Sequence, residues 1–104
     1  MSYELLFTDE ANSQLDKHET SKSLKVQYKA VIKSLRYLEE NPQHPSLNTH
    51  KFSSLKGPEG CEVFEAYAQN NTSGAWRIFW SYYPKKKKTD LKGLITIISI
   101  TPYP

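Results

Sequence analysis

The sequence predicts an α+β domain in which two N-terminal helices pack on one face of an antiparallel-rich sheet. The first half of the chain carries apolar residues at helical spacing, whereas the second half carries aromatic and β-branched runs typical of strands. The length of 104 residues fits one domain, and no repeat or linker divides the chain. We therefore expect residues 1–104 to fold as one unit with the element order β-α-α-β-β-β.

The chain opens with a short strand and a first helix. Residues 3–7 form an apolar, strand-like run, and Thr8 follows as the expected N-cap, with two acidic residues behind it that suit the positive end of a helix dipole. Ala11 and Leu15 then lie four residues apart, on one face of the predicted helix.

A second, longer helix is the most regular pattern in the sequence. Its apolar positions step by three and four residues: Leu24, Tyr28, Val31, Leu35 and Leu38. Ile32 widens this stripe, and basic residues take the other positions, as is typical of an amphipathic helix. Pro42 ends the helix, because proline disfavours helical geometry in the residue before it.

Three strands are predicted after this helix. Residues 42–60 are rich in Pro, Gly, Ser, His and Lys and show no period, so we expect a long loop of the kind that is often functional. Residues 63–68 and 75–83 have strand composition and predict a hairpin around the turn residues 70–74. Residues 94–101 predict an interior strand, because both of its faces are apolar.

Charge and cysteine content narrow the function classes. The formal charge of +3 permits an anionic partner without requiring one. The single cysteine, Cys61, excludes an intrachain disulfide and a multi-cysteine zinc site. The chain start has no secretory signal pattern, and no apolar run approaches the roughly 20 residues that a membrane helix needs. We therefore expect a cytoplasmic protein that contacts no membrane.

Two histidines of the predicted loop are candidates for chemistry. His44 and His50 lie six residues apart and could surround a metal together with Cys61. Zinc ligands usually come in tighter pairs, so we expect neither a metal nor another cofactor. A loop histidine could instead transfer protons, since its side chain titrates near neutral pH.

Arg77 stands inside an otherwise apolar strand and is the least expected residue of the chain. Strand alternation places the bulky side chains at positions 76, 78, 80 and 82 toward the helices and Arg77 on the opposite, wetter face. One interpretation is a solvated side chain, or an ion pair with Glu65 or Glu62 across the hairpin. The other is a fixed guanidinium that binds two phosphate oxygens at once.

A run of lysines follows the same strand, at positions 85–88. Such a run is usually a solvated loop without fixed geometry. It could also form a flexible electrostatic contact to a polyanion such as RNA, carried by Lys85 and Lys86. Taken from the residues alone, the sequence indicates a small basic α+β domain that favours an anionic partner.

Three stretches carry a resemblance to a known family. The first is residues 35–42 with His44-Pro45-Ser46-Leu47 and His50-Lys51, the second is Trp76-Arg77-Ile78-Phe79-Trp80, and the third is residues 95–104. With the element order, they resemble the RelE/ParE superfamily of toxins from bacterial type II toxin–antitoxin systems. The resemblance spans nearly the whole chain and implies a microbial-RNase-like fold.

The resemblance also implies an activity, a metal-independent cleavage of mRNA that is commonly bound to the ribosome. In this reaction the ribose 2′-hydroxyl attacks the adjacent phosphodiester and the 5′-oxygen leaves. Arg77 matches the family's strand arginine, which stabilises charge that builds on the phosphorane. Lys51 and Lys56 match the region of cationic RNA contacts, and His50 is a candidate for proton transfer.

The end of the chain departs from the family pattern, because Pro102-Tyr103-Pro104 stands where close relatives have Pro-His-Pro. Tyrosine, whose ordinary pKa is near ~10, can donate a proton to the leaving oxygen but is a poor base near pH 7. Tyr103 is therefore a candidate acid or RNA contact. The alternative is a non-catalytic, ParE-like or degenerate scaffold that binds gyrase or an antitoxin only. Both readings imply a cognate antitoxin as partner.

Overall fold

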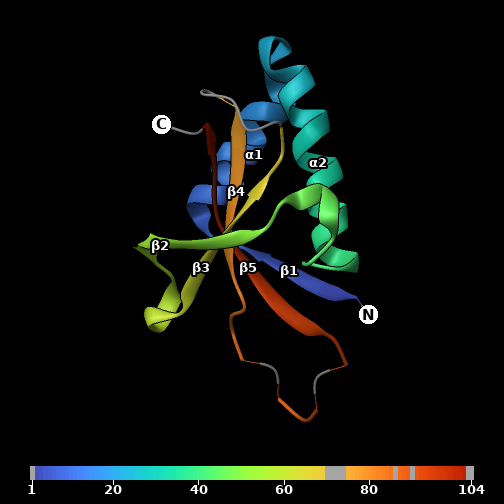
Figure 1. Ribbon diagram of the computed structural model, residues 1–104. Helices are drawn as coiled ribbons and strands as arrows, with labels where there is room; N and C mark the ends of the chain where they lie inside the picture. Colours follow the sequence, from blue (N-terminus) through green and yellow to red (C-terminus); the bar gives the residue numbers. More distant parts are fainter. Residues whose placement is uncertain (1, 70–74, 86, 90, 103–104) are drawn as a thin grey trace.

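The computed structural model describes residues 2–69, 75–85, 87–89 and 91–102, which form one α+β layer structure (Figure 1). The elements in chain order are β1 Tyr3–Phe7, α1 Asp9–Thr20, α2 Lys25–Glu40, β2 His50–Lys56, β3 Glu62–Tyr67, β4 Trp76–Ser81 and β5 Gly93–Pro102. Three short 3-10 helices, η1 Lys22–Leu24, η2 Pro45–Leu47 and η3 Pro58–Gly60, lie between them. The predicted α+β class is confirmed.

The sheet is mixed and has the order β1-β5-β4-β3-β2. β1 and β5, the two ends of the chain, run parallel, whereas the other three pairings are antiparallel. The predicted hairpin of β3 and β4 and the interior position of β5 are confirmed. The predicted element order is wrong at one point, because β2 adds a strand before β3.

β2 lies within residues 42–60, which the sequence predicts as a loop. Six of its seven residues are exposed, and apolar and polar residues do not alternate along the strand. Its pairing with β3 is also irregular, with a register shift between Lys51 and Lys56. The strand forms because β3 offers an edge, and not because its own sequence favours it.

The N-terminus of α1 is fixed to β5 by Thr8. The Thr8 hydroxyl oxygen accepts a hydrogen bond from the Ala11 amide at 3.0 Å, as predicted for an N-cap. The same hydroxyl donates to the Ile98 carbonyl at 2.7 Å. One side chain therefore caps the helix and holds its first turn against the sheet. Neither helix in the described part of the chain is long and apolar enough to cross a bilayer.

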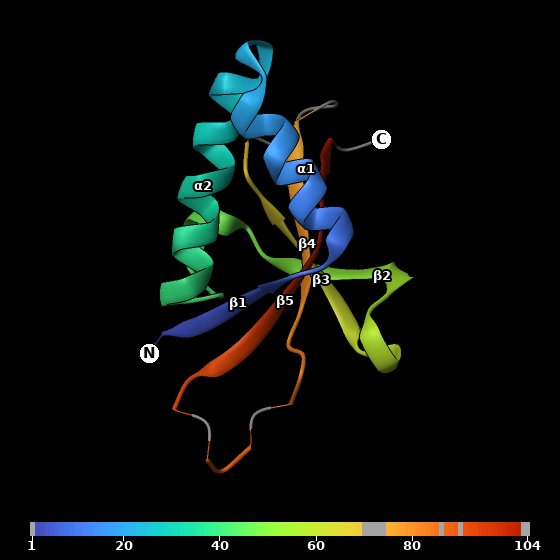
Figure 2. The ribbon, with the colours of Figure 1, turned by 180° about the vertical axis from the view of Figure 1, so that it is seen from behind.

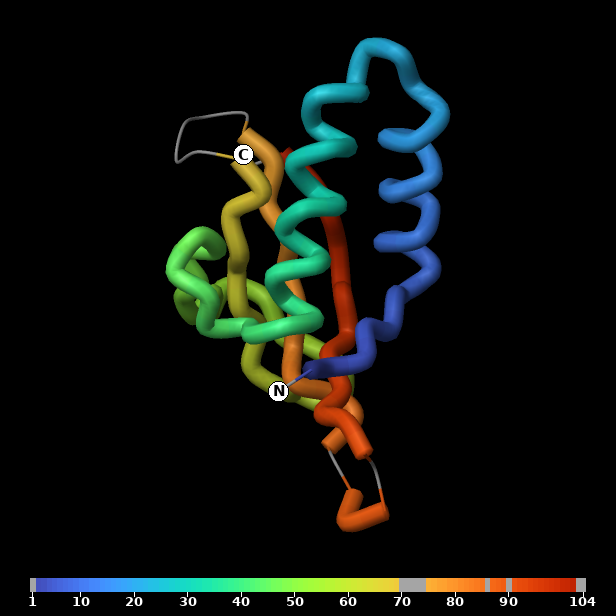
Figure 3. The backbone as a smooth tube through the Cα atoms, turned by 90° about the vertical axis from the view of Figure 1, so that its right-hand side faces the viewer, coloured from blue at the N-terminus to red at the C-terminus, as the bar shows by residue number. Residues whose placement is uncertain are grey.

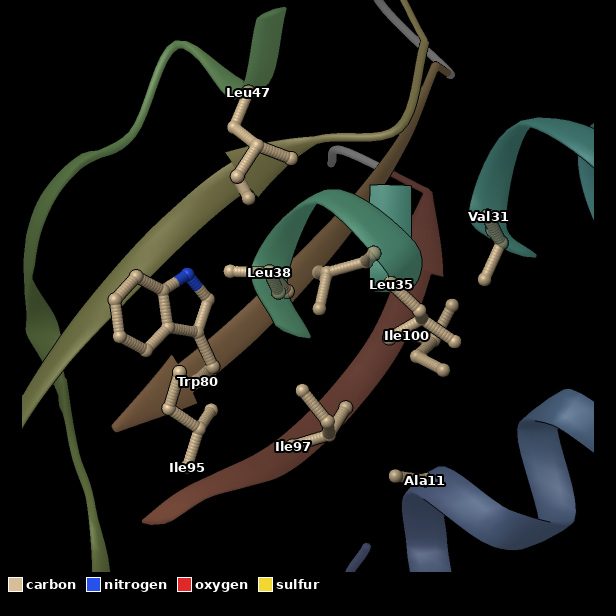
Figure 4. Packing of buried hydrophobic residues seen from close by; sticks show 11 residues of the cluster. Ala11, Val31, Leu35, Leu38, Leu47, Trp80, Ile95, Ile97 and Ile100 are labelled. Atoms are coloured by element: carbon tan, nitrogen blue, oxygen red, sulfur yellow. The ribbon is translucent and has the colours of Figure 1, made fainter. Parts of the chain in front are cut away.

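The hydrophobic core lies between the helices and one face of the sheet (Figures 3 and 4). Its buried members are Ala11, Val31, Leu35, Leu38, Leu47, Ala66, Ile78, Trp80, Ile95, Ile97 and Ile100. The predicted apolar stripe of α2 supplies Val31, Leu35 and Leu38 to it. Burial of each such side chain contributes about 1.5–3 kcal/mol, so this core is the main source of stability.

A β-bulge in β5 explains how three isoleucines reach the same core. Phe79 pairs with Ser99, but Trp80 pairs with Ile97, so Ile98 is an extra residue on β5. Without the bulge, Ile97 and Ile100 would point to opposite faces, because side chains alternate along a strand. With it, both lie in the core beside the helices.

Candidate functional site on the sheet face opposite the helices

The side chains of β3 and β4 that point away from the helices form a polar cluster. Ile78 and Trp80 occupy the helix-facing core, so Arg77 and Phe79 face the other side. Tyr67 is the cross-strand partner of Arg77, and Glu65 that of Phe79. Directly opposite and diagonal neighbours share one face and are within reach of each other, so Glu65, Tyr67 and Arg77 meet there.

Arg77 is buried in this cluster, with only 1% of its surface exposed. Its Nε lies 3.6 Å from Glu65 Oε2, and its Nη1 donates to the Ala75 carbonyl at 3.0 Å. Its guanidinium carbon is 4.1 Å from the centre of the Tyr67 ring, a cation–π contact. The predicted ion pair with Glu65 is confirmed, and so is the face on which Arg77 lies, but the prediction of a wet, solvated face is wrong.

β2 covers part of the sheet face that points away from the helices. In Figure 1 it runs at a steep angle to β3 and β4, and Figure 2 shows the same crossing from the helical side. Its Phe52 ring lies 4.9 Å from the ring of Phe79, which belongs to β4 and not to the adjacent β3. β2 therefore bends over the outer face instead of extending the sheet flat. The expectation of a solvated Arg77 followed from strand alternation, which gives the face of a side chain but not what covers that face.

His50 is where the cluster reaches the surface. It is the cross-strand partner of Glu65, and its Nε2 lies 2.6 Å from Glu65 Oε1. The Glu65 side chain is 2% exposed, whereas the His50 side chain is 48% exposed. The other ring nitrogen, Nδ1, lies 3.0 Å from the Asn48 carbonyl oxygen. A buried carboxylate thus orients a surface imidazole, and both ring nitrogens donate when the imidazole is protonated.

Tyr67 contacts two members of the cluster, His50 and Arg77. Its ring stands edge-on to His50, with the ring centres 5.3 Å apart, and its face receives Arg77. The result is a continuous path of contacts from a buried guanidinium, through a buried carboxylate, to an exposed imidazole. Such an arrangement can position a proton donor or acceptor at the surface and can present positive charge to an anion.

The predicted cationic contacts Lys51 and Lys56 are exposed on β2, with Lys51 next to His50 in the chain and Lys56 at the far end of the strand. Lys51 Nζ is 3.1 Å from Glu62 Oε1, and both side chains are more than half exposed, so this pair is weak. Lys51 and Lys56 line the same small cavity of about 180 Å³ next to Cys61. Lys85 is exposed in the connection after β4 and does not line that cavity. Lys86 and Tyr103 lie outside the described residues.

Tyr83, which contacts the turn after β2, has a raised pKa. Tyr83 donates a hydrogen bond to the Glu59 carboxylate, and this bond, together with the negative charge of Glu59, raises the pKa of Tyr83 above its ordinary value of 10.0. Glu59 belongs to η3, in the turn between β2 and β3. The bond therefore ties that turn to the end of β4.

The residues considered for a metal are not brought together. His44 stacks on Tyr37 with ring centres 4.1 Å apart, and its Nδ1 accepts a hydrogen bond from the Ser46 amide. His50 is held by Glu65, and Cys61 is a half-buried free thiol. Within the described ranges, no group of three or more His, Cys, Asp or Glu side chains is placed to hold a metal ion.

Sequence reasoning named Glu65 only as a partner of Arg77 and did not name Tyr67. The sequence contains a signal for this buried pair, because a glutamate stands in one apolar strand and an arginine in the next. Opposite charges in neighbouring apolar strands are buried only as a pair. The link from Glu65 to His50 had no such signal, because it depends on β2.

Comparisons with known proteins add no identification. Protein-family models, curated proteins and solved structures were each searched, and none of the three comparisons found a match.

Proposed function

We propose that the protein is an RNA-cleaving toxin of the RelE-like kind, whose chemistry takes place at His50. The observation that carries the proposal is the contact between His50 Nε2 and Glu65 Oε1 at 2.6 Å, with the histidine half exposed and the glutamate buried. A carboxylate behind an imidazole fixes the orientation of the ring, as in other acid–base sites. The Arg77 guanidinium compensates the buried charge of Glu65 from the other side.

The reaction that fits this group is an internal transesterification. The 2′-oxygen of a ribose attacks the adjacent phosphorus, the bond from phosphorus to the 5′-oxygen breaks, and a cyclic phosphate and a 5′-hydroxyl result. The 2′-hydroxyl loses a proton and the leaving oxygen gains one. With its Nε2–H held by Glu65, a neutral imidazole takes the 2′-hydroxyl proton at Nδ1 once RNA replaces the Asn48 carbonyl as the partner of that nitrogen. The same nitrogen then gives this proton to the leaving 5′-oxygen.

Arg77 has a different role in this proposal from the one that the family resemblance implies. A guanidinium with 1% exposure does not reach a phosphate directly. We assign it as a positioning residue that acts through Glu65. Lys51 and Lys56 then supply the direct phosphate contacts, and Lys85 and Lys86 add non-specific attraction for RNA. We further propose a cytoplasmic site of action on ribosome-bound mRNA, without a metal, and a cognate antitoxin that restrains the activity.

The test is cleavage of ribosome-bound mRNA by the purified protein in the presence of EDTA, followed by primer extension. His50→Ala and Glu65→Gln should lower kcat by about 10²–10⁴-fold, the usual contribution of a positioned acid or base. His44→Gln is the matched control, since His44 is the other histidine of this segment and lies outside the cluster. Equal cleavage by wild type and His50→Ala would remove the proposal.

A non-catalytic scaffold is the second candidate, and a groove along α2 favours it. This groove of about 510 Å³ is lined by apolar parts of Tyr28 and Ile32 and by charged side chains, of which three are cations, Lys29, Lys33 and Arg36, and one is an anion, Glu40. Its chemistry suits an acidic, amphipathic segment of a protein partner. Growth arrest that persists on expression of His50→Ala, with intact mRNA, would favour this candidate, and gyrase inhibition would then be assayed.

A further inference from the structure

A second cleft opens beside His50, at the end of β3. It lies between α2, η2 and the edge of β3. Its volume of about 430 Å³ is within the size range of small-molecule sites. His50 of β2 pairs with Glu65 of β3, and Lys51 pairs with Phe64. If this antiparallel pairing continued toward the N-terminus of β2, Asn48 would lie opposite Tyr67. Asn48 instead has φ 48° and ψ 42°, a left-handed conformation that turns the chain away. The edge of β3 at Tyr67 is left facing the cleft.

The lining of this cleft is rich in groups that both donate and accept hydrogen bonds. Ser46, Asn48 and Gln69 supply groups of this kind, and Lys33 adds a donor only. Gln69 is held in place because its Oε1 accepts from the Trp76 amide at 2.9 Å, so its amide nitrogen can donate into the cleft. The Tyr67 carbonyl, at 3.5 Å from the Ser34 hydroxyl, lies on the same side.

The cleft and His50 share residues. The Asn48 carbonyl accepts from His50 Nδ1 at 3.0 Å, while Asn48 itself lines the cleft. Tyr67 likewise lines the cleft and contacts the His50 ring. His50 and the cleft therefore lie at the same end of the β3 edge, with His50 on the outer face and the cleft on the side of α2. A polymer that crosses this edge places the unit next to the one at His50 in the cleft.

We propose that this cleft binds the nucleobase next to the phosphate that His50 attends, an inference that rests on the proposed function. The edge of a base carries hydrogen-bond donors and acceptors. The side-chain amides of Asn and Gln can form two hydrogen bonds with such an edge at once. Lys33, at the rim of α2, contacts the phosphate on the far side of the bound nucleotide. The cleft is then the place where base preference is determined.

The experiment compares cleavage of short RNAs that differ in one base beside the scissile phosphate. Asn48→Gly removes the side-chain amide but keeps the left-handed backbone, which glycine adopts without strain. It should lower the ratio of kcat/KM between the best and worst base by about tenfold, since one such pair discriminates by that order. Gln43→Ala, an exposed amide outside the cleft, is the matched control and should leave the ratio unchanged. Circular dichroism checks the fold of each variant.

The outcomes separate this inference from the proposed function. Cleavage that depends on His50 but keeps its full base preference in Asn48→Gly overturns the cleft and leaves the nuclease. If no RNA is cut, a 2′-O-methyl oligonucleotide is titrated while the side-chain amide signals of Asn48 and Gln69 are followed by NMR. Their selective shift in the wild type, with the Gln69 shift lost in Asn48→Gly, supports the cleft without the nuclease, and unchanged signals in the wild type overturn the cleft.

Discussion

Replacing Arg77 by methionine should destabilise the fold strongly, because it leaves Glu65 as a buried charge. Methionine keeps a similar length and loses the ion pair, the Ala75 hydrogen bond and the contact with Tyr67. Removing one partner of a buried ion pair usually costs about 3–5 kcal/mol. The remaining contact of Glu65 with His50 at 2.6 Å moves the expected loss toward the lower end, about 3 kcal/mol.

This loss is large for a domain of 104 residues, whose total stability is expected to be about 5–15 kcal/mol. In thermal unfolding followed by circular dichroism it corresponds to a decrease in Tm of about 12–24 °C. The double variant Arg77→Met with Glu65→Leu removes both charges and should recover at least half of the loss, because an apolar pair of similar volume replaces a buried ion pair at little cost. A loss below about 1 kcal/mol in Arg77→Met, with simple additivity in the double variant, would refute the buried pair.

Three further predictions test other parts of the structure. Thr8→Ala should lower the free energy of unfolding by about 1–2 kcal/mol in urea denaturation, whereas Thr8→Ser keeps the cap to Ala11 and should lose less. Leu38→Ala should cost about 2–5 kcal/mol in the same assay, since Leu38 is fully buried, and Val26→Ala on the exposed side of α2 is its control within about 0.5 kcal/mol. Tyr83, followed by NMR of its labelled ring carbon, should ionise above pH 10.0 because Glu59 raises its pKa, and Glu59→Gln should bring the transition back toward that value. The raised pKa means that this bond stabilises the fold below pH 10.0 and is lost as pH rises through the folded-state pKa; an unchanged midpoint in Glu59→Gln would contradict the assigned bond.

The elements that the sequence predicts correctly are those whose signal is local. The apolar stripe from Tyr28 to Leu38 and the cap at Thr8 need no information from the rest of the chain, and both are found where predicted. Leu24, the first predicted position of the stripe, lies in η1, one residue before α2. The hairpin of β3 and β4 is also local, since its turn residues lie between two apolar runs. The parallel pairing of β1 with β5 joins residues about 90 positions apart, and no short pattern encodes such a partner.

β2 is the element that sequence reasoning could not find, and most of the errors at the site follow from it. Six of its seven residues are exposed and its apolar residues do not alternate with polar ones, so its strand form depends on the edge of β3. Phe52 of β2 packs on Phe79 of the outer face, and Arg77 is buried on that same face against Glu65 and Tyr67. β2 also brings His50 to Glu65, so the site at His50 depends on a strand that the sequence does not predict.

Burial along the cluster determines which variants can report on function. Loss of activity in an Arg77 variant would not show that Arg77 contacts RNA, because the same change is expected to weaken the fold. His50 is half exposed, and its removal leaves Glu65 paired with Arg77, so the expected stability loss is only about 1–2 kcal/mol. Substitution of Arg77 is therefore expected to lower stability, and substitution of His50 is expected to lower activity. Substitution of Glu65 is expected to lower both. A purely structural ion pair would give the same stability effects and no change of activity at His50, which makes this histidine the position that decides between the two.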